Sequence, residues 1–189
     1  MKLKMDLHTH CYEATYIPLP KLIDRVAVKK IVTSVKSKGL DGIAITEHYR
    51  KEFGTTTRDI ISKHFDNQII IIPGREIYSQ GYHLVELFFP DDIVFRFLPH
   101  PIYDERLEKH YDFSKIHGIE IGNHYYDPYI DKPRIRALAE KYNLLLLSNS
   151  DAHDLNNIGY HYNEICLDDL INRAQTSSEG GVNTLAPHS

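Results

Sequence analysis

The sequence contains few cysteines, little net charge and no long apolar run. Cys11 and Cys166 are too few for a disulfide framework. The 22 basic and 26 acidic side chains leave a formal net charge of −4, which disfavours a nucleic-acid coat or a polybasic membrane anchor. The longest aliphatic runs, 69–72 and 144–147, are far shorter than the roughly 20 residues that span a bilayer. We therefore expect a cytoplasmic protein that forms no stable complex with membranes or nucleic acid.

Signatures of several common enzyme classes are also missing. The chain has no Gly-x-Ser-x-Gly elbow, no glycine-rich phosphate loop of the Walker type and no dinucleotide fingerprint. Ser150, Asp151 and His153 are the residue types of a hydrolase triad, but their adjacency in sequence does not provide triad geometry. Serine-hydrolase, P-loop and dinucleotide-dependent chemistry are therefore disfavoured.

The length and the pattern of the chain predict a single α/β domain. Its 189 residues are 42% hydrophobic and 25% charged, which is typical of a globular domain with its own core. Strand patterns alternate with helical periodicity, which favours βα units around a mostly parallel sheet or barrel. The predicted strands are 2–7, 42–46, 68–72, 82–89, 94–98, 118–121, 144–147 and 160–167. The predicted helices are 22–38, 59–65 with Thr57 as its cap, 131–142 and 168–174.

The ends of the chain give two further expectations. The alternating strand pattern begins almost at the first residue, so we expect no signal peptide. The barrel domain is predicted to occupy residues 1–174. Residues 175–189 have few apolar side chains and are predicted to form a flexible or loosely docked tail.

Histidine is abundant, with 12 residues, or about 6% of the chain. It is the commonest metal ligand and general acid–base in proteins. Many of these histidines belong to polar motifs that follow predicted strands, and residues at the carboxyl ends of strands in a βα barrel converge on one mouth. These motifs are Asp6-Leu7-His8-Thr9-His10, Thr46-Glu47-His48, Pro73-Gly74-Arg75-Glu76, Pro99-His100-Pro101 and Ser150-Asp151-Ala152-His153, with His83 near the start of its strand.

The spacing of the first motif points to metal binding. Positions i and i+2 of a strand face the same way, so His8 and His10 can hold one ion together, and the same parity applies to Asp151 and His153. Asp6 shares the parity of His8 one step deeper, where it could accept a hydrogen bond from a ligand histidine. Unpaired charges in a barrel mouth are costly, whereas metal ions would neutralise and ligate the set.

Taken in order, these motifs resemble the polymerase and histidinol phosphatase (PHP) family, over most of residues 1–170. The resemblance implies a distorted (β/α)7 TIM-like barrel. It also implies two or three divalent transition-metal ions, namely zinc, manganese or iron, and the hydrolysis of phosphoesters. Glu47, where Asp is commoner in the family, is expected to support the site rather than to bind metal.

The resemblance also implies roles for individual residues. One ion would be held by His8, His10, Glu76 and Asp151; a second by Glu76, His83 and His100; and a third by His48 and His153. Thr15 stands where the family usually supplies another ligand to the third ion, and Glu13 is the nearby carboxylate that could replace it. Glu76, Asp151 and His153 are the candidate catalytic residues, and Arg75 and Arg50 are candidate contacts for substrate.

The function that the resemblance implies is that of a metal-dependent phosphoesterase. A water bridging two cations would supply hydroxide to attack a phosphomonoester or phosphodiester, such as a small phosphorylated substrate or a short nucleotide. The alternative is a PHP-like barrel that has lost catalysis and serves as a scaffold for RNA or protein. The intact histidines and the net charge of −4 favour the enzyme.

Overall fold

A computed structural model describes residues 1–15, 23–79, 82–102, 108 and 111–179. The helices are α1 (Cys11–Ala14), α2 (Arg25–Ser37), α3 (Glu52–His64), α5 (Lys132–Tyr142) and α6 (Leu167–Glu179), and the short 3-10 turns are η1 (Phe113–Lys115), η2 (Asp127–Tyr129) and η3 (Leu155–Asn157). The strands are β1 (Leu3–Thr9), β2 (Gly42–Ile45), β3 (Ile70–Ser79), β4 (Tyr82–Phe88), β5 (Val94–Leu98), β6 (Gly118–Asn123), β7 (Leu145–Asn149) and β8 (Asn163–Ile165). Within the described residues, no helix is long and apolar enough to cross a membrane.

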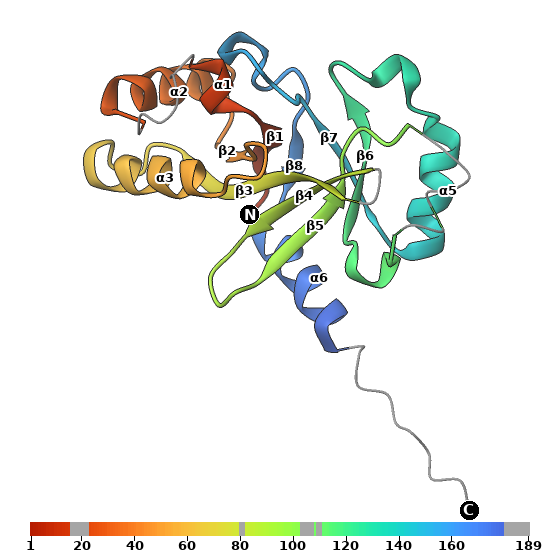
Figure 1. Cartoon of the computed structure of the whole chain (residues 1–189). Coiled ribbons are helices and arrows are strands. Elements are labelled where there is room, and N and C mark those ends of the chain that lie inside the picture. The colour runs from red at the N-terminus through yellow and green to blue at the C-terminus, as the bar shows by residue number, and fades with distance from the viewer. Residues whose placement is uncertain (16–22, 80–81, 103–107, 109–110, 180–189) are drawn as a thin grey trace, which may run out of the picture.

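The strands form one sheet in the order β7-β6-β5-β4-β3-β2-β1-β8. Strands β1, β2 and β3 run parallel, as do β5, β6 and β7. Strand β4 is antiparallel to both of its neighbours, and β8 is antiparallel to β1. The α/β barrel is therefore confirmed, with the reversed β4 as its main distortion (Figure 1).

The sheet curls until its two sides meet at the mouth. The amide of Asp151, just after β7, donates to the carbonyl of His8 on β1 over 2.9 Å. Farther from the mouth, the side chain of Asn163 on β8 forms the two hydrogen bonds that a neighbouring strand would form with Ser148 of β7. Its Oδ1 accepts from Ser148 N over 2.9 Å, and its Nδ2 donates to Ser148 O over 3.0 Å. The barrel is thus nearly closed, and β1 and β7 lie side by side at the mouth.

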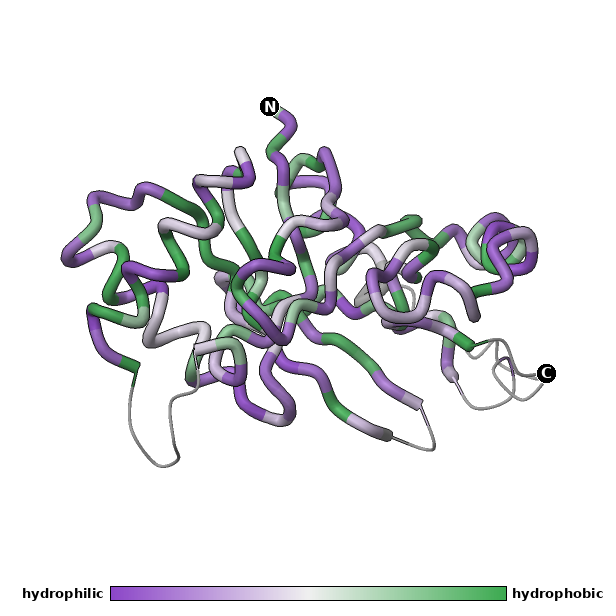
Figure 2. The backbone as a smooth tube through the Cα atoms, turned by 90° about the horizontal axis from the view of Figure 1, so that it is seen from above, coloured by the Kyte–Doolittle hydropathy of each residue, from purple (hydrophilic) through white to green (hydrophobic). Residues whose placement is uncertain are grey.

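Hydrophobic side chains fill the barrel below the mouth. The buried interior cluster includes Leu7, Val85, Leu87, Phe95 and Phe97, each with essentially no solvent exposure. Figure 2 shows hydrophobic segments running through the central strands. Helix α6 contributes to the same cluster, whereas α5 packs on β6 and β7. Close packing of these large apolar side chains holds the strands in place. The residues at the strand ends are therefore held rigidly, as a site at the mouth requires.

Capping residues mark the ends of two helices. Asp24 accepts from the amide of Ala27 over 2.9 Å at the start of α2, and Gly39 follows the end of α2 with a φ of 68°. Asp131 accepts from the amide of Arg134 at the start of α5.

Helix α3 begins at Glu52, earlier than the predicted 59–65 segment, so the expected cap at Thr57 is wrong. Thr57 is buried inside the helix, and its hydroxyl donates to the carbonyl of Phe53 over 2.9 Å. The sequence does not indicate a helix start at Glu52, because Gly54 lies in the first turn and glycine is a weak helix former. Glycine is needed there because a Cβ would come within 2.9 Å of the Cα of Pro73.

The last helix also differs from expectation. Helix α6 runs to Glu179, so the chain stays helical beyond Gln175, where the tail was expected to begin. Leu170 and Ala174 of this helix are buried in the interior cluster, which ties it to the barrel. Residues 180–189 of the predicted tail lie outside the described residues.

Candidate metal centre

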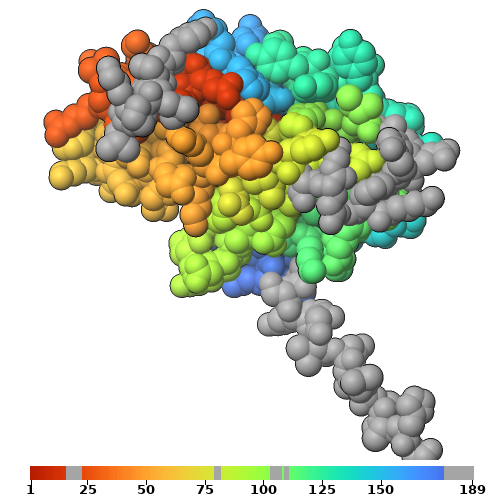
Figure 3. Space-filling model, viewed as in Figure 1, coloured from red at the N-terminus to blue at the C-terminus, as the bar shows by residue number. Residues whose placement is uncertain are grey.

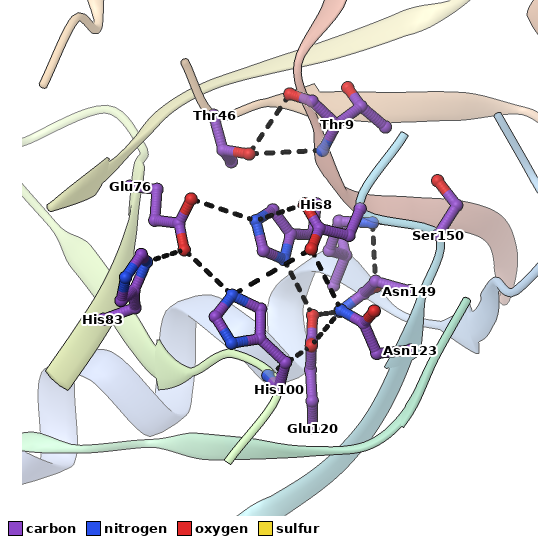
Figure 4. A network of polar contacts seen from close by, with 12 residues as sticks. His8, Thr9, Thr46, Glu76, His83, His100, Glu120, Asn123, Asn149 and Ser150 are labelled. Carbon is purple, nitrogen blue, oxygen red and sulfur yellow. Dashed lines mark hydrogen bonds and ion pairs between the residues drawn. The ribbon is translucent and has the colours of Figure 1, made fainter. Parts of the chain in front are cut away.

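The barrel mouth brings together all eight of the predicted metal ligands. His8 and His10 come from the end of β1, His48 follows β2, Glu76 lies on β3 and Asp151 follows β7. The reversal of β4 explains a further position: its amino end lies at the mouth, so His83 points into the site although it stands near the start of its strand (Figure 4). The remaining two, His100 and His153, follow β5 and β7.

Four of these residues form what we call the inner cluster: His8, His10, Glu76 and Asp151. The Nε2 atoms of His8 and His10 are 3.2 Å apart. Glu76 Oε2 lies 3.6 and 3.4 Å from these two nitrogens, and Asp151 Oδ1 lies 3.4 and 3.2 Å from them. Each carboxylate oxygen therefore lies close to both imidazole nitrogens.

The spacing of the inner cluster fits a metal ion. Zinc bonds of about 2.0–2.2 Å to nitrogen and oxygen place the corners of a tetrahedral site roughly 3.3–3.6 Å apart. The five donor distances of 3.2–3.6 Å fall in or beside this range. Asp151 Oδ1 is also buried without a hydrogen-bond partner among the described residues. Buried carboxylate oxygens normally accept hydrogen bonds, so an oxygen that accepts none is free to bind a metal ion.

Glu76 connects the inner cluster to a second one. Its Oε2 faces His8 and His10, whereas its Oε1 lies 2.6 Å from His83 Nδ1 and 3.1 Å from His100 Nε2. We call Glu76, His83 and His100 the bridged cluster; their donor atoms lie within 4.8 Å of one another. The two oxygens of one carboxylate thus face two separate sets of histidines, as the predicted bridging role requires.

The electrostatics of the clusters follow from close packing of opposite charges. Burial alone would raise the pKa of Glu76, but hydrogen bonds from His10, His100, His8 and His83 outweigh it and hold the pKa well below the usual range. Burial alone would lower the pKa of His10, but Asp151 and Glu76 raise it to about 9. Protons and metal ions compete for the same histidine nitrogens, so these raised values make metal binding dependent on pH.

A third set of ligands, the outer cluster, consists of His10, Glu13, His48 and His153. Its donor atoms also lie within 4.8 Å of one another. Glu13 stands on the single-turn helix α1, with Oε1 3.8 Å from His48 Nε2 and Oε2 3.5 Å from His153 Nε2. Thr15 is turned away, because its hydroxyl donates to the carbonyl of Tyr12. The structure therefore brings Glu13, and not Thr15, to the third set of histidines.

A layer of buried polar groups lies behind the candidate ligands and orients them. Glu120 on β6 accepts from His8 Nδ1 over 3.0 Å, and it is itself held by the side-chain amides of Asn149 and Asn123 at 2.9 and 3.0 Å (Figure 4). Because a carboxylate accepts hydrogen bonds, the proton of the neutral His8 ring is on Nδ1, and Nε2 presents a lone pair to the inner cluster. Glu120 lies in the predicted strand 118–121 and Asn123 just after it, whereas nothing in the sequence indicates the role of Asn149.

The expected role of Asp6 is wrong. Its carboxylate accepts from the amide and hydroxyl of Ser150 and from the amide of Gly159 over 2.9 Å, and it contacts no ligand imidazole. Burial raises the pKa of Asp6 to about 6 despite these bonds. Asp6 therefore anchors the loop that carries Asp151, while Glu120 orients His8. Glu47 supports the site as expected, because it is buried and accepts from the amide of Tyr12 in α1.

Two of the candidate ligands lie on unusual backbone. Asp151 has a φ of 56° and His100 a φ of 30°, in the left-handed region that residues other than glycine seldom occupy. Hydrogen bonds hold both positions: Asp151 N donates to His8 O, and His100 N donates to Glu120 Oε2 over 2.7 Å. Such strain is typical of functional sites, where the surrounding structure fixes the side chain in one direction.

The two candidate substrate contacts differ. Arg75 directly precedes Glu76 on β3, so its side chain points to the opposite face of the strand. Its guanidinium lies 2.6 Å from Glu86, which also pairs with Arg96. This arrangement does not favour a substrate role for Arg75. Arg50 is exposed, and its side chain forms no hydrogen bond or ion pair with the described part of the chain.

A family model described as PHP-associated matches residues 130–175, about a quarter of the chain, including α5, β7 and the Ser150–His153 motif. The resemblance to the PHP family is thereby confirmed. No curated protein has a sequence that matches this chain.

Several solved structures share this barrel fold. PsfC from Pseudomonas syringae is 14% identical with a TM-score of 0.62, over 95% of this chain and 97% of that chain. A proposed metal-dependent phosphoesterase from Bifidobacterium adolescentis is 11% identical with a TM-score of 0.62, over 95% and 96% of the two chains. An amidohydrolase from Chromobacterium violaceum, solved with bound sulfate and no metal, is 12% identical with a TM-score of 0.64, over 89% and 96%. Likenesses at identities this low show a common fold only. The chemistry of this chain has to be inferred from its own site.

Proposed function

We propose that this chain is a PHP-family phosphoesterase that hydrolyses a phosphomonoester or phosphodiester with two or three divalent ions of zinc, manganese or iron. The observation that carries the proposal is the arrangement of Glu76, whose two oxygens face two separate sets of histidines. A bridging carboxylate between two closely spaced ions is the central element of many two-metal hydrolytic sites. The same ligands would have no purpose in a scaffold that only binds RNA or protein.

The protein's own groups prepare the ligands for this role. His8 Nδ1 is held by Glu120, and His153 Nδ1 lies 2.9 Å from the carbonyl of Asp151. A carbonyl only accepts hydrogen bonds, so His153 carries its proton on Nδ1 and presents Nε2 to the outer cluster. Bound divalent ions would supply an activated water and charge to stabilise the phosphate oxygens. These hydrogen bonds fix the tautomer and the orientation of both imidazole rings. The donor atoms are therefore already in place, and little reorganisation is needed when ions bind.

The chemistry of the ions favours an anionic substrate. Divalent ions held by the clusters would coordinate phosphate oxygens and stabilise the negative charge on them. A neutral amide would offer the ions a single carbonyl oxygen and no charge. The sulfate bound to the amidohydrolase from C. violaceum is a tetrahedral oxyanion of the same kind. Arg50, exposed and without a partner in the described residues, is the cation that we propose to contact the substrate.

In this proposal Asp151 and His153 act together at the open side of the mouth. Asp151 belongs to the inner cluster, whereas His153 is partly exposed and faces Glu13. This position suits His153 for holding an ion, or for giving a proton to the leaving oxygen. The free thiols Cys11 and Cys166 agree with a reducing, cytoplasmic location, which we also propose.

A comparison of three chromogenic substrates tests the proposed function. The chain should be stripped with a chelator, reloaded with Zn or Mn, and assayed with p-nitrophenyl phosphate, bis-p-nitrophenyl phosphate and a p-nitroanilide. We expect the reloaded protein to hydrolyse at least one phosphoester and to leave the anilide intact. Hydrolysis of the anilide alone would contradict the phosphoesterase. Inactivity toward all three, combined with RNA binding, would support the scaffold.

A further inference from the structure

The single-turn helix α1 carries Glu13 to the outer cluster but has no capping group of its own. Its four residues are too few for a helix that is stable by itself in water. His10, at the position before the helix, forms no side-chain hydrogen bond with the amides of α1. The first amides of a helix need acceptors from outside the helix. The position of α1 therefore depends on a neighbouring element.

That neighbour is Glu47, which follows β2. It is only 4% exposed, and its Oε1 accepts from the amide of Tyr12 in α1. The amide of Glu13 contacts the same carboxylate. Within the described ranges of the chain, no other side chain accepts a hydrogen bond from a backbone amide of α1. A carboxylate in this place satisfies free amides and interacts favourably with the positive end of the helix dipole, so Glu47 caps α1 from another part of the barrel.

Glu13 depends on this support because its own contacts are weak. Its side chain is 45% exposed, and its oxygens lie 3.8 Å from His48 Nε2 and 3.5 Å from His153 Nε2. Figure 3 shows the first part of the chain, in red, at the surface beside the segment that follows β7, in blue. Ion pairs between exposed side chains contribute little stability. The direction of Glu13 is therefore set by the backbone of α1.

Glu47 connects two sides of the outer cluster without belonging to it. It directly precedes His48, so one short segment after β2 supplies a ligand and also holds the helix that supplies another. The donor atoms within 4.8 Å of one another in this cluster come from other residues, namely His10, Glu13, His48 and His153. The geometry thus favours an action of Glu47 through α1 over direct binding of an ion.

We propose that Glu47 is a positioning residue of the outer cluster, which fixes α1 so that Glu13 can bind the third ion. This inference rests on the metal centre of the proposed phosphoesterase and names the group that controls its outer ion. The ligands of the inner and bridged clusters lie outside α1, so the outer ion can be lost separately. The length of Glu47 matters, because aspartate is one methylene shorter and would draw the carboxylate back from α1.

A double-mutant cycle between Glu47 and Glu13 tests the proposal. Zinc binding to the chelator-treated chain should be measured by calorimetry in the parent protein, Glu47→Ala, Glu13→Gln and the double variant. The outer ion is the one whose affinity Glu13→Gln lowers. We expect Glu47→Ala to weaken this ion by about 10- to 100-fold and to leave the other two unchanged. In the Glu13→Gln background the same change should have little further effect, because the residue that it positions is no longer the ligand.

Further variants and hydrogen exchange assign the effect to α1. Glu47→Gln keeps an oxygen that can accept from Tyr12 and should retain most of the affinity, whereas Glu47→Asp should resemble Glu47→Ala and replaces it if that variant does not fold. In the metal-free protein, the amides of Tyr12 and Glu13 should exchange faster in Glu47→Ala, with the amides of β1 and β3 unchanged. Glu86→Ala is the matched control, because Glu86 is buried in the same sheet and pairs with arginines instead of α1.

The outcomes separate this inference from the proposed function. Equal weakening by Glu47→Ala with and without Glu13 would overturn the positioning role and show that Glu47 acts on the ion itself. Unchanged affinity for the outer ion, or loss of all the ions, would overturn it as well. A parent chain that binds only two ions would also overturn it and leave a two-metal phosphoesterase standing. Failure of the loaded parent to hydrolyse any phosphoester, with the cycle as expected, would overturn the proposed function alone.

Discussion

Replacing Glu76 by glutamine should empty two metal clusters at once. Glu76→Gln keeps the size of the side chain and removes its charge. In the structure this side chain is only 2% exposed, and its two oxygens lie within 2.6–3.6 Å of His8, His10, His83 and His100. The inner and the bridged cluster share no other ligand, so a simultaneous loss can be traced to this one carboxylate.

The size of the effect follows from the contacts of Glu76. Loss of a group that merely supports a metal ligand lowers metal affinity by about 10- to 100-fold, so loss of a direct ligand should cost on the order of 100-fold or more at each cluster. Removing one partner from a buried ion pair also destabilises a protein by about 3–5 kcal/mol. The metal-free variant should therefore unfold at lower urea concentration than the metal-free parent protein.

Metal titration by calorimetry, with elemental analysis after dialysis, measures the loss directly. Glu86→Gln is the matched control, because Glu86 is a similarly buried carboxylate in the same sheet that pairs with Arg75 and Arg96 instead of the ligands. We expect Glu76→Gln to lose two ions and Glu86→Gln to keep them. The reasoning is refuted if Glu76→Gln loses a single ion, or if the control loses as many.

Three further predictions concern other parts of the centre. Glu13→Gln should weaken binding of the outer ion alone, whereas Thr15→Ala should leave the binding of all ions unchanged. Competition with a colorimetric chelator measures both affinities. Weaker binding in Thr15→Ala and unchanged binding in Glu13→Gln would instead make Thr15 the ligand. Glu120→Gln should lower metal affinity about 10- to 100-fold, because His8 would lose the hydrogen bond that orients its ring. Unchanged affinity would show that Glu120 does not orient His8. For the metal-free protein, the pKa of His10 is raised from 6.5 to about 9, so its stabilisation is complete below pH 6.5 and is lost as the pH rises through 9. Urea unfolding of that protein should show about 3 kcal/mol less stability at pH 9.5 than at pH 6, with excess zinc opposing the loss; a flat profile would count against the raised pKa.

The ligand set could be predicted from the sequence because it depends on simple geometry. His8 and His10 share a face of one strand, and the carboxyl ends of parallel strands meet at one mouth. The position of Arg75 could have been predicted in the same way, since a residue adjacent to Glu76 on a strand must face the other side. The sequence thus contained the evidence against Arg75 as a substrate contact.

Other features depended on the folded chain. The reversal of β4 places His83 at the mouth, and no local pattern distinguishes an antiparallel strand from a parallel one in a buried sheet. Glu13 reaches the outer cluster only because residues 11–14 form a helical turn after β1. Asn149 gave no signal, because a lone asparagine at a strand end more often caps a loop than holds a buried carboxylate.

The metal content of the protein, purified without added metal, tests the central claim most directly. We expect at least two tightly bound transition-metal equivalents per chain, with phosphoesterase activity that disappears on chelation and returns on adding Mn or Zn. Less than one bound equivalent, with no phosphoesterase activity after either metal is added, would contradict it.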